Sequence, residues 1–557
     1  MFRIKPPILL LIIGFVTYAN SLFNSFVLED RANILRNPSI QNFFNIPNLF
    51  FHQVGGQESL QYYRPVLFTF YTLLYSLFGE FTFPYHFVQL LLQITNSFLI
   101  FVLFKKYLNK QIAFIISILF LIHPINEETV VWIANLQDVL FVFFGLLSLL
   151  VLQRKVLSTK NILLSNLLVL LSLFSKEAGI LFVGLGFLYV YLYHKKDFWF
   201  YSFFTGITGI IYVILRLASQ IPLQKESLVP IMGLTFSQRM IQIPSIIFYY
   251  LKTLLFPFSL AVYHSEIIHE INFENFYFPL IVDVIFLGLL LSVAYKLIQK
   301  GTDKKIVLFF LLWFSLGLLL HIQIIPLDFT VADHFFLFPF IGLLGLTGLY
   351  INQFGKKFLN QKIVLGLTFI ILSLLFVRTV VRNFDWRDQK TLLSHDIKVN
   401  PNDYLLELLY TTELINDKKL DEAETHIHHA ISLYPQSYLG LSSLGVIYYQ
   451  KGDFKKAKES FERSMKYGRN FGAYENYGLL LLKHDSLPVA NEFIRKANNI
   501  FPNSKTLWYY RIISEYKSGN LDMALLASKN YYLLSLDQQS YTIYSYLKEK
   551  KPIKIEF

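Results

Sequence analysis

The chain has 557 residues, 54% of them hydrophobic and 16% charged, and its mean hydropathy of +0.45 excludes an ordinary soluble protein and predicts a polytopic membrane protein. The net charge is +12, but Lys and Arg gather in short runs between apolar segments and form no basic stripe, so nucleic acid is not a predicted partner. The chain has no cysteine, which excludes disulfides and thiolate metal sites.

The first apolar segment, residues 8–24, is nearly long enough to cross a hydrocarbon core of ~30 Å. Arg3 and Lys5 precede it as in a signal peptide, but no clear cleavage site follows, so a retained first helix is predicted. Two adjacent carboxylates, Glu29 and Asp30, stand where this helix leaves the membrane. Acids are also common in aqueous loops, so this pair alone leaves a functional and an ordinary interpretation open.

Together with this first segment, ten further apolar stretches predict a helix bundle of about eleven spans, several of them short enough to tilt or to end within the bundle. The stretches are residues 8–24, 84–104, 111–123, 135–152, 161–174, 178–193, 198–216, 279–298, 305–321, 335–351 and 361–380. Two less apolar stretches, residues 65–78 and 240–258, are rich in aromatic residues. They are predicted to lie along the outer membrane interface, and the alternative is that each crosses.

Basic residues fall in alternate short loops and predict the orientation of the bundle. These loops are residues 105–110, 154–160, 195–196, 300–305 and 356–362. By the positive-inside rule they are cytoplasmic, together with the N-terminus. The opposite loops are then non-cytoplasmic, and they comprise residues 25–83, 124–134, 175–177, 217–278 and 322–334.

After residue 381 the hydropathy falls and a repeat of about 34 residues appears, which is the period of tetratricopeptide helix pairs. The recurring small residues are Ala423, Ala457, Ala490 and Ala524. Small residues let paired helices approach closely, so about four repeats are predicted to stack as an α-solenoid. The predicted fold is therefore all-α. It consists of a transmembrane domain at 1–381 with an extracytoplasmic loop at 25–83, a connecting segment at 382–400, and repeats at 401–557.

The predicted non-cytoplasmic loops collect polar groups on one side of the membrane. Besides the acid pair, they contain Arg64, His123, Glu128, Lys176, Glu177, Arg216, Asp333 and His334. Burial of charges between short apolar stretches costs several kcal/mol unless the charges are paired or face a cavity, so a polar cavity is predicted. Such a cavity suits a donor with a phosphate leaving group, where cations hold the phosphate and a carboxylate takes the proton of an attacking hydroxyl. An ordinary ion pair between Lys176 and Glu177, and a helix-end role for His123, are the alternatives.

Other site chemistries find little support in the sequence. There is no glycine-rich phosphate loop, metalloprotease histidine pair or nucleophile elbow. No spacing of acids and histidines specifies a metal, so no cofactor is predicted, and a divalent metal stays open as an alternative.

Seven short motifs occur in a characteristic order along nearly the whole chain. They are Glu29-Asp30 after Phe26, Tyr63-Arg64-Pro65, Phe83-Pro84-Tyr85-His86, His123-Pro124-Ile125 with Glu128, Lys176-Glu177-Ala178-Gly179-Ile180, Val331-Ala332-Asp333-His334 and Arg382-Asn383-Phe384-Asp385-Trp386. In this order, and followed by repeats, they resemble the transmembrane and tetratricopeptide-repeat O-mannosyltransferase family. That family belongs to the C-type glycosyltransferases, which use polyprenyl-phosphate-linked sugars.

The resemblance implies that Asp30 is the catalytic base, with Glu29 as its acidic neighbour where the family usually carries two aspartates. It also implies donor phosphate-binding residues, namely Arg64, Lys176, Arg216 and His334, and site-lining residues, namely His123, Glu128, Glu177 and Asp333. His334 stands where an Arg commonly follows the acid of the family motif. Phosphate contact at this position would therefore depend on histidine protonation.

The predicted function is transfer of a sugar, mannose by family analogy, from a polyprenyl-phosphate donor to a hydroxyl acceptor, a protein Ser or Thr presented by the repeats. A rival class is a non-catalytic scaffold that anchors a repeat domain for an envelope or secretory complex. A transporter lacks support because no inverted internal repeat is found. The predicted location is a bacterial inner membrane in preference to an endoplasmic reticulum, with membrane lipid around the bundle and the repeats on the non-cytoplasmic side.

Overall fold

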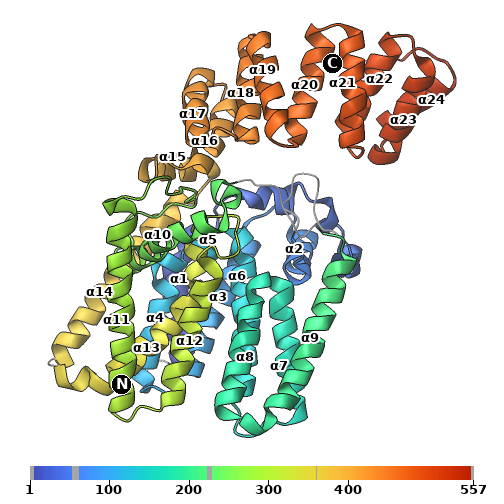
Figure 1. The fold of residues 1–557 in the computed structure, drawn as a ribbon. Coiled ribbons are helices and arrows are strands. Elements are labelled where there is room, and N and C mark those ends of the chain that lie inside the picture. Colours follow the sequence, from blue (N-terminus) through green and yellow to red (C-terminus); the bar gives the residue numbers. More distant parts are fainter. Residues whose placement is uncertain (1–4, 53–61, 222–228, 359–360, 554–557) are drawn as a thin grey trace. The chain divides into compact units, whose positions relative to one another are not determined.

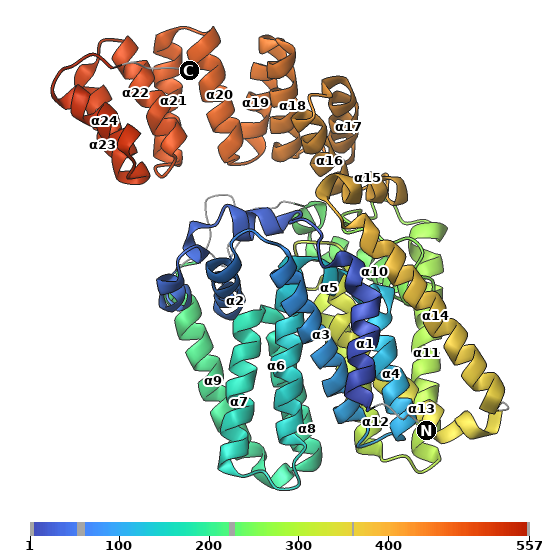
Figure 2. The ribbon, with the colours of Figure 1, turned by 180° about the vertical axis from the view of Figure 1, so that it is seen from behind.

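The computed structural model describes residues 5–52, 62–221, 229–358 and 361–553, and these residues form helices and loops without a β-strand. The chain divides into two compact units, Met1–Asn400 and Pro401–Phe557. The first unit is a bundle of apolar helices, and the second is a row of short helix pairs (Figures 1 and 2).

The bundle alternates between two ends. Figure 1 shows the basic loops between α3 and α4, α6 and α7, α8 and α9, and α11 and α12 at one end, and the break after α4 at the other. The helices are α1 (Pro6–Tyr18), α2 (Pro65–Phe78), α3 (Phe83–Phe104), α4 (Lys110–Ile122), α5 (Glu128–Val131), α6 (Leu136–Leu152), α7 (Thr159–Ser175), α8 (Ile180–Tyr193), α9 (Phe198–Ala218), α10 (Phe236–Leu255), α11 (Phe278–Gln299), α12 (Lys304–His321), α13 (Leu337–Phe358), α14 (Gln361–Asp385) and α15 (Gln389–Val399).

Seven helices in the described part of the chain are long and apolar enough to cross a membrane, or eight if α4 and Pro124–Val131, bent by 56°, form one span. The chain is thus a multi-pass membrane protein, but the predicted count of about eleven spans is wrong. α1, α7 and α8 have only 13, 17 and 14 residues. At ~1.5 Å per residue each falls short of a ~30 Å hydrocarbon core. The two aromatic stretches form α2 and α10, and neither is among the candidate spans.

The break between α4 and α5 brings a non-helical segment into the bundle. Pro124 cannot donate a backbone hydrogen bond, and the His123 Nδ1 atom instead accepts from the Ile125 N–H at 3.1 Å. The Asn126 side chain donates to the Phe120 carbonyl at 2.8 Å and so satisfies one of the last carbonyls of α4. Gln89 of α3 donates to the carbonyls of residues 129 and 132, at 2.7 Å each. Side chains therefore replace the missing helical hydrogen bonds.

The second unit is built from four antiparallel helix pairs and a last helix, as tetratricopeptide repeats are. The pairs are α16 (Tyr404–Asn416) with α17 (Leu420–Leu433), α18 (Tyr438–Lys451) with α19 (Phe454–Tyr467), α20 (Phe471–His484) with α21 (Leu487–Ile500) and α22 (Lys505–Lys517) with α23 (Leu521–Ser535), followed by α24 (Gln538–Lys548). The four recurring alanines are fully buried between the paired helices. The predicted all-α fold, a membrane bundle followed by an α-solenoid, is confirmed.

Gly445 of α18 is expected to be essential for the packing of its pair. A Cβ atom at this position would lie 2.6 Å from the ring of Phe461, which is fully buried and cannot move aside. Gly445→Ala is therefore expected to destabilise the repeat unit by about 1–3 kcal/mol. Hydrogen exchange of α18 and α19 should accelerate accordingly.

Gly472→Ala is the matched control for this prediction. Gly472 also lies in a repeat helix, but a Cβ there would have its nearest neighbour at an ordinary 3.4 Å. This substitution should leave exchange unchanged or slower, because Ala favours a helix over Gly. Equal acceleration by both substitutions would contradict the packing argument.

Candidate functional site

A cavity of about 560 Å³ lies in the membrane unit, at the end of the bundle opposite the basic loops. Its polar part is lined by Glu29, Asn33, Tyr62, Arg64, Asn135, Gln137, Lys176, Glu177, His321, Asp328 and His334. Its apolar part is lined by residues of α7, α8, α9 and α12, among them Leu173, Ile180, Val183, Val213 and Leu320. The sequence prediction of a cavity that holds both acids and cations agrees with this geometry.

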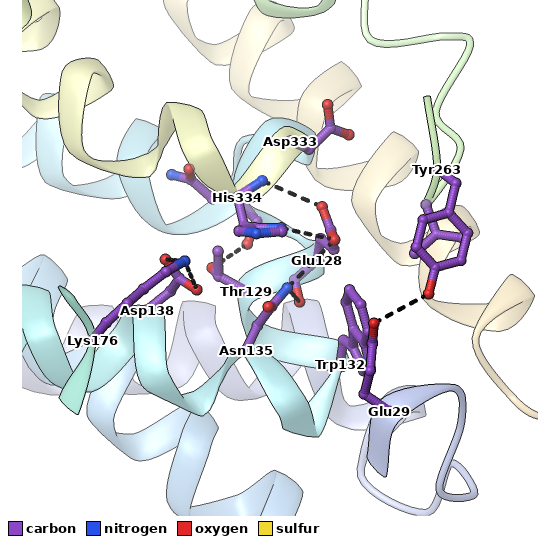
Figure 3. Close-up of polar contacts among 12 residues, drawn as sticks. Glu29, Glu128, Thr129, Trp132, Asn135, Asp138, Lys176, Tyr263, Asp333 and His334 are labelled. Atoms are coloured by element: carbon purple, nitrogen blue, oxygen red, sulfur yellow. Dashed lines mark hydrogen bonds and ion pairs between the residues drawn. The ribbon is translucent and has the colours of Figure 1, made fainter. Parts of the chain in front are cut away.

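Glu29 faces the cavity because of an unusual backbone conformation before it. Leu28 has a φ of 51°, a left-handed conformation that is rare outside glycine, and its N–H donates to the Gln389 Oε1 atom at 3.0 Å. The Glu29 Oε1 atom accepts from the Tyr263 hydroxyl at 3.5 Å (Figure 3). The Oε2 atom is buried and has no hydrogen-bond partner. Burial, with the nearby acid Glu128 contributing, raises the pKa of Glu29 to about 7.

Asp30 is turned away from the cavity. Its Oδ2 atom accepts from the Val27 N–H at 3.1 Å and its Oδ1 atom from the Ala134 N–H at 2.7 Å. The side chain is fully buried and does not line the cavity, and burial raises the pKa of Asp30 well above its ordinary value. The geometry thus gives Asp30 a structural position, where it ties the Glu29 segment to the start of α6. It does not favour the predicted role of Asp30 as the base.

Two ion pairs supply the cations of the cavity. The Lys176 Nζ atom donates to both carboxylate oxygens of Asp138, at 2.7 and 2.8 Å (Figure 3). Arg64 donates to the Glu177 Oε2 atom from its Nε and Nη2 atoms, at 3.0 and 2.9 Å. The alternative of a Lys176–Glu177 ion pair is therefore wrong, because each residue pairs with a partner distant in sequence. Burial lowers the pKa of Lys176, against the attraction of Asp138.

His334 lines the cavity but is engaged by an acid. Its Nδ1 atom lies 3.0 Å from the Glu128 Oε1 atom, and its backbone N–H donates to the Oε2 atom at 3.2 Å. Asn135 also contacts Glu128, at 3.4 Å. Glu128 itself contacts His334 (Figure 3) but does not belong to the cavity lining. The pair therefore fixes the orientation of the imidazole at the cavity wall.

Three further predicted site residues lie outside the lining of this cavity, as far as the structure describes it. The Asp333 Oδ1 atom accepts from the Tyr249 hydroxyl at 2.7 Å, the His123 Nε2 atom lies 3.1 Å from the Leu254 carbonyl, and Arg216 donates to the Ile221 carbonyl at 2.9 Å. The helix-end alternative for His123 agrees with its contacts. Arg216 ends α9 beside the cavity without facing it.

Sequence reasoning missed several lining or supporting residues. Asp138 could have been identified from the sequence, because an acid in the first turn of the apolar helix α6 predicts a buried partner or a cavity. Asp328, which accepts a hydrogen bond from the Tyr62 hydroxyl, lies in an ordinary-looking loop. Trp132 lines the cavity, and its buried Nε1 atom has no partner. No group of three or more His, Asp or Glu arranged for a metal occurs among the described residues.

The fold and the cavity define a multi-pass membrane protein with a charged internal site and a repeat domain. The chain is similar to protein O-mannosyl-transferases. It is 24% identical to Protein O-mannosyl-transferase TMTC3 of Homo sapiens, over 90% of this chain and 61% of that protein. It is also 24% identical to Protein O-mannosyl-transferase F38B6.6 of Caenorhabditis elegans, over 78% of this chain and 63% of that protein. These similarities confirm the resemblance predicted from the motifs.

The similarity has clear limits. The chain spans about three-fifths of the length of these curated relatives. No family model matches it. Among solved structures it is similar to YrrB, described as a TPR protein with an unusual peptide-binding site, at 18% identity and a TM-score of 0.25 over 28% of this chain and 84% of that chain.

Proposed function

We propose that the chain is a membrane glycosyltransferase that moves a sugar from a polyprenyl-phosphate donor to a hydroxyl acceptor. This proposal rests on one observation: a single cavity has both a charged part and an apolar part. Ile180 of α8 and Val213 of α9 line the apolar part and are also 57% and 51% exposed. The apolar part therefore reaches the outer surface of the bundle, where an isoprenoid chain could enter from the bilayer.

Arg64 and Lys176 are proposed to hold the donor phosphate. A guanidinium has five N–H donors and an ammonium has three. Arg64 gives two of its five to Glu177 and one to Gln137. Lys176 makes two contacts to Asp138. Each cation can thus keep its acid and still donate to a phosphate oxygen. Such charge-assisted hydrogen bonds strengthen as negative charge develops on the leaving phosphate. This arrangement supplies the electrostatic stabilisation of transfer without requiring a metal.

Glu29 is proposed as the base, in place of Asp30. Its unpartnered Oε2 atom would take the proton of the acceptor hydroxyl while the hydroxyl oxygen attacks the anomeric carbon. The bond between that carbon and the phosphate oxygen breaks, and its electron pair leaves with the polyprenyl phosphate. Attack opposite the leaving group inverts the anomeric centre. Each of these steps uses groups of the cavity itself.

The names of the relatives support mannose as the sugar and a protein as the acceptor. We further propose that the cavity end is non-cytoplasmic, because the basic loops lie at the other end of the bundle. The absence of cysteine favours a bacterial inner membrane over an endoplasmic reticulum. The repeats are proposed to present the acceptor peptide.

Transfer can be tested with purified chain in detergent, radiolabelled polyprenyl-phosphate mannose and peptides that contain Ser or Thr. Label should reach the peptide as an alkali-labile product, with and without a divalent-metal chelator. Loss of transfer with chelator would reject the metal-independent form of the proposal. Failure of all donors and peptides, by protein that still binds peptide through its repeats, would favour the scaffold.

Arg64→Gln is expected to weaken donor binding by about 10- to 100-fold, since a hydrogen bond to a charged group contributes roughly 1.5–3 kcal/mol. Arg64 is preferred to Lys176 for this test because its partner Glu177 is 45% exposed in its side chain and can be hydrated once unpaired. The readout is the KM for donor from initial rates. Arg216→Gln removes a nearby cation outside the cavity and should change KM little. Equal shifts in both variants would reject a phosphate contact at Arg64.

The pH dependence of transfer gives a further test. Because burial raises the pKa of Glu29 to about 7, kcat/KM should rise as the pH passes about 7 and level off above it. The contribution of Glu29 to folding stability changes with pH in the opposite direction to kcat/KM. A carboxyl whose folded pKa is raised favours the folded state below its unfolded pKa, and this contribution is lost as the pH rises towards 7. Initial rates between pH 5 and 9 measure the profile, and an inflection near pH 4 instead would contradict it.

A further inference from the structure

A second cavity, a broad depression that is open to the surface and has a volume of about 630 Å³, lies at the other end of the membrane unit. It is formed by the end of α3, the start of α4 and the end of α6, and it shares no lining residue with the first cavity. Its lining consists of Val102, Lys105, Lys106, Lys110, Leu150, Gln153 and Arg154. Four of these seven residues are cations, and no acid belongs to this lining among the residues that the structure describes.

Neutral groups hold two of the four cations in place. The Lys106 Nζ atom donates to the Gln153 carbonyl at 2.8 Å and to the Tyr189 hydroxyl at 3.3 Å. The Arg154 Nη1 atom donates to the Asn161 Oδ1 atom at 2.9 Å. These partners fix the side chains but do not neutralise them. Four like charges around one concavity repel one another, so an anion bound there would be attracted by all four.

The surroundings of this cavity indicate the kind of anion. α3 and the helix that contains α6 are both candidate membrane spans, and the cavity lies at their ends, where lipid headgroups meet water. Val102 and Leu150 add apolar side chains to the lining, which suits the acyl end of a lipid and not a fully hydrated ion. The exposed side chains of Lys105 and Lys110 complete the cationic rim.

We propose that this cavity binds the phosphate headgroup of an anionic membrane lipid. Basic pockets at the ends of transmembrane helices suit such headgroups, and each Lys or Arg near the surface strengthens the attraction. The site lies apart from the proposed transfer site and does not depend on it. Its occupant is a lipid of the surrounding leaflet, and a soluble phosphate is the alternative source of the same chemistry.

The proposal can be tested with the full chain in detergent, titrated with phosphatidylglycerol and observed by native mass spectrometry. Lys105→Gln/Lys110→Gln removes two exposed cations of the cavity, where packing changes little. Affinity for phosphatidylglycerol should fall about thirtyfold, at about tenfold per 1.4 kcal/mol. The matched control is Lys195→Gln/Lys196→Gln, which removes the same charge from the same end of the bundle but outside the cavity. It should lower affinity by less than about threefold.

Three results would overturn the proposal. Equal losses in the two double variants would show that the general charge of this end attracts the lipid. Equal binding of zwitterionic phosphatidylcholine would show that no headgroup is recognised. Displacement of the lipid by millimolar inorganic phosphate would assign the cavity to a soluble anion. Lys105→Arg/Lys110→Arg keeps both charges, and its binding at the wild-type level would support the electrostatic origin.

Discussion

Glu29→Gln is expected to lower the turnover of sugar transfer by about 10² to 10⁴, with little change in the KM for donor. The amide keeps the shape of the side chain and its contact with the Tyr263 hydroxyl, but it cannot accept the proton of the attacking hydroxyl. The donor phosphate is proposed to lie against Arg64 and Lys176, so its affinity does not depend on this proton. Initial rates against donor concentration separate the two effects.

Asp30→Asn provides the contrasting variant. Both oxygens of Asp30 accept backbone N–H groups, so the amide nitrogen of Asn would face a donor at one of them. The expected loss is about 1–3 kcal/mol of stability, the cost of a buried donor left unsatisfied. Glu266→Gln, at an acid outside the first cavity, controls for general charge. Wild-type turnover in Glu29→Gln together with a 10²-fold loss in a stably folded Asp30→Asn would return the base to Asp30.

The two carboxylates show why the site could be predicted only in part. Glu29 and Asp30 are chemically alike and adjacent, so residue type cannot tell which one faces the substrate. The left-handed conformation of Leu28 and the hydrogen bond from the Ala134 N–H, 104 residues away from Asp30, determine which carboxylate faces the cavity. Neither feature can be recognised in the sequence. The motif therefore located the acidic pair, and the tertiary structure places Glu29, but not Asp30, in the cavity lining.

The ion pairs illustrate the same limit. Lys176 and Glu177 are neighbours in the chain, but Lys176 has an extended backbone with φ of −157° and ψ of 145°, so the two side chains diverge. Lys176 forms an ion pair with Asp138, 38 residues earlier in the chain, and Glu177 forms one with Arg64. A charged residue within an apolar stretch predicts a buried partner or a cavity, and this part of the prediction agrees with the structure. The identity of the partner depends on which helices meet.

The fold was more predictable, since its signals are periodic. The recurrence of alanine at the repeat spacing identified the helix pairs, whose close packing leaves no room for larger side chains. Hydropathy also located the apolar helices, but it overcounted the spans. A helix such as α8, with 14 residues, is as apolar as a true span and differs only in length. The boundaries of short helices depend on tertiary contacts, and an average of hydropathy over a sequence window contains no information about these contacts.

The residues that directly follow the motif at the end of α14 anchor the Glu29 segment. Ser25 donates its N–H to the Arg387 carbonyl at 3.0 Å, and Leu28 donates to the Gln389 side chain at the same distance. Arg382 joins α14 to α15 through two hydrogen bonds to Asp396, at 2.6 and 3.0 Å. All these contacts belong to the first unit. Arg382 of the family-like motif thus holds α14 and α15 together around the residues that contact the Glu29 segment.

Asp396→Asn is accordingly expected to destabilise the membrane unit by about 3–5 kcal/mol, because it leaves the buried Arg382 guanidinium without its main carboxylate. Asp385→Asn is the matched control. Asp385 also contacts Arg382, at 3.2 Å, but its side chain is 19% exposed, so its loss should cost less than about 1 kcal/mol. Thermal unfolding in detergent, followed by tryptophan fluorescence to which the buried Trp386 contributes, measures both. Similar midpoints for the two variants would contradict the assignment.

The pH dependence of stability gives this pair an independent signature. Burial alone would raise the pKa of Asp396, but the Arg382 guanidinium and the hydrogen bonds to Asp396 outweigh it and hold this pKa below its ordinary value. A carboxyl with a lowered folded pKa stabilises the protein above its unfolded pKa, and this contribution is lost as the pH falls through the folded pKa. Wild-type protein should therefore lose stability steeply below about pH 4, and Asp396→Asn should lose less over the same range. The Arg382–Asp396 pair holds the residues that anchor the Glu29 segment, so Asp396→Asn should also lower turnover at temperatures where it remains folded. Combining Asp396→Asn with Arg382→Met should recover part of the stability but not the turnover.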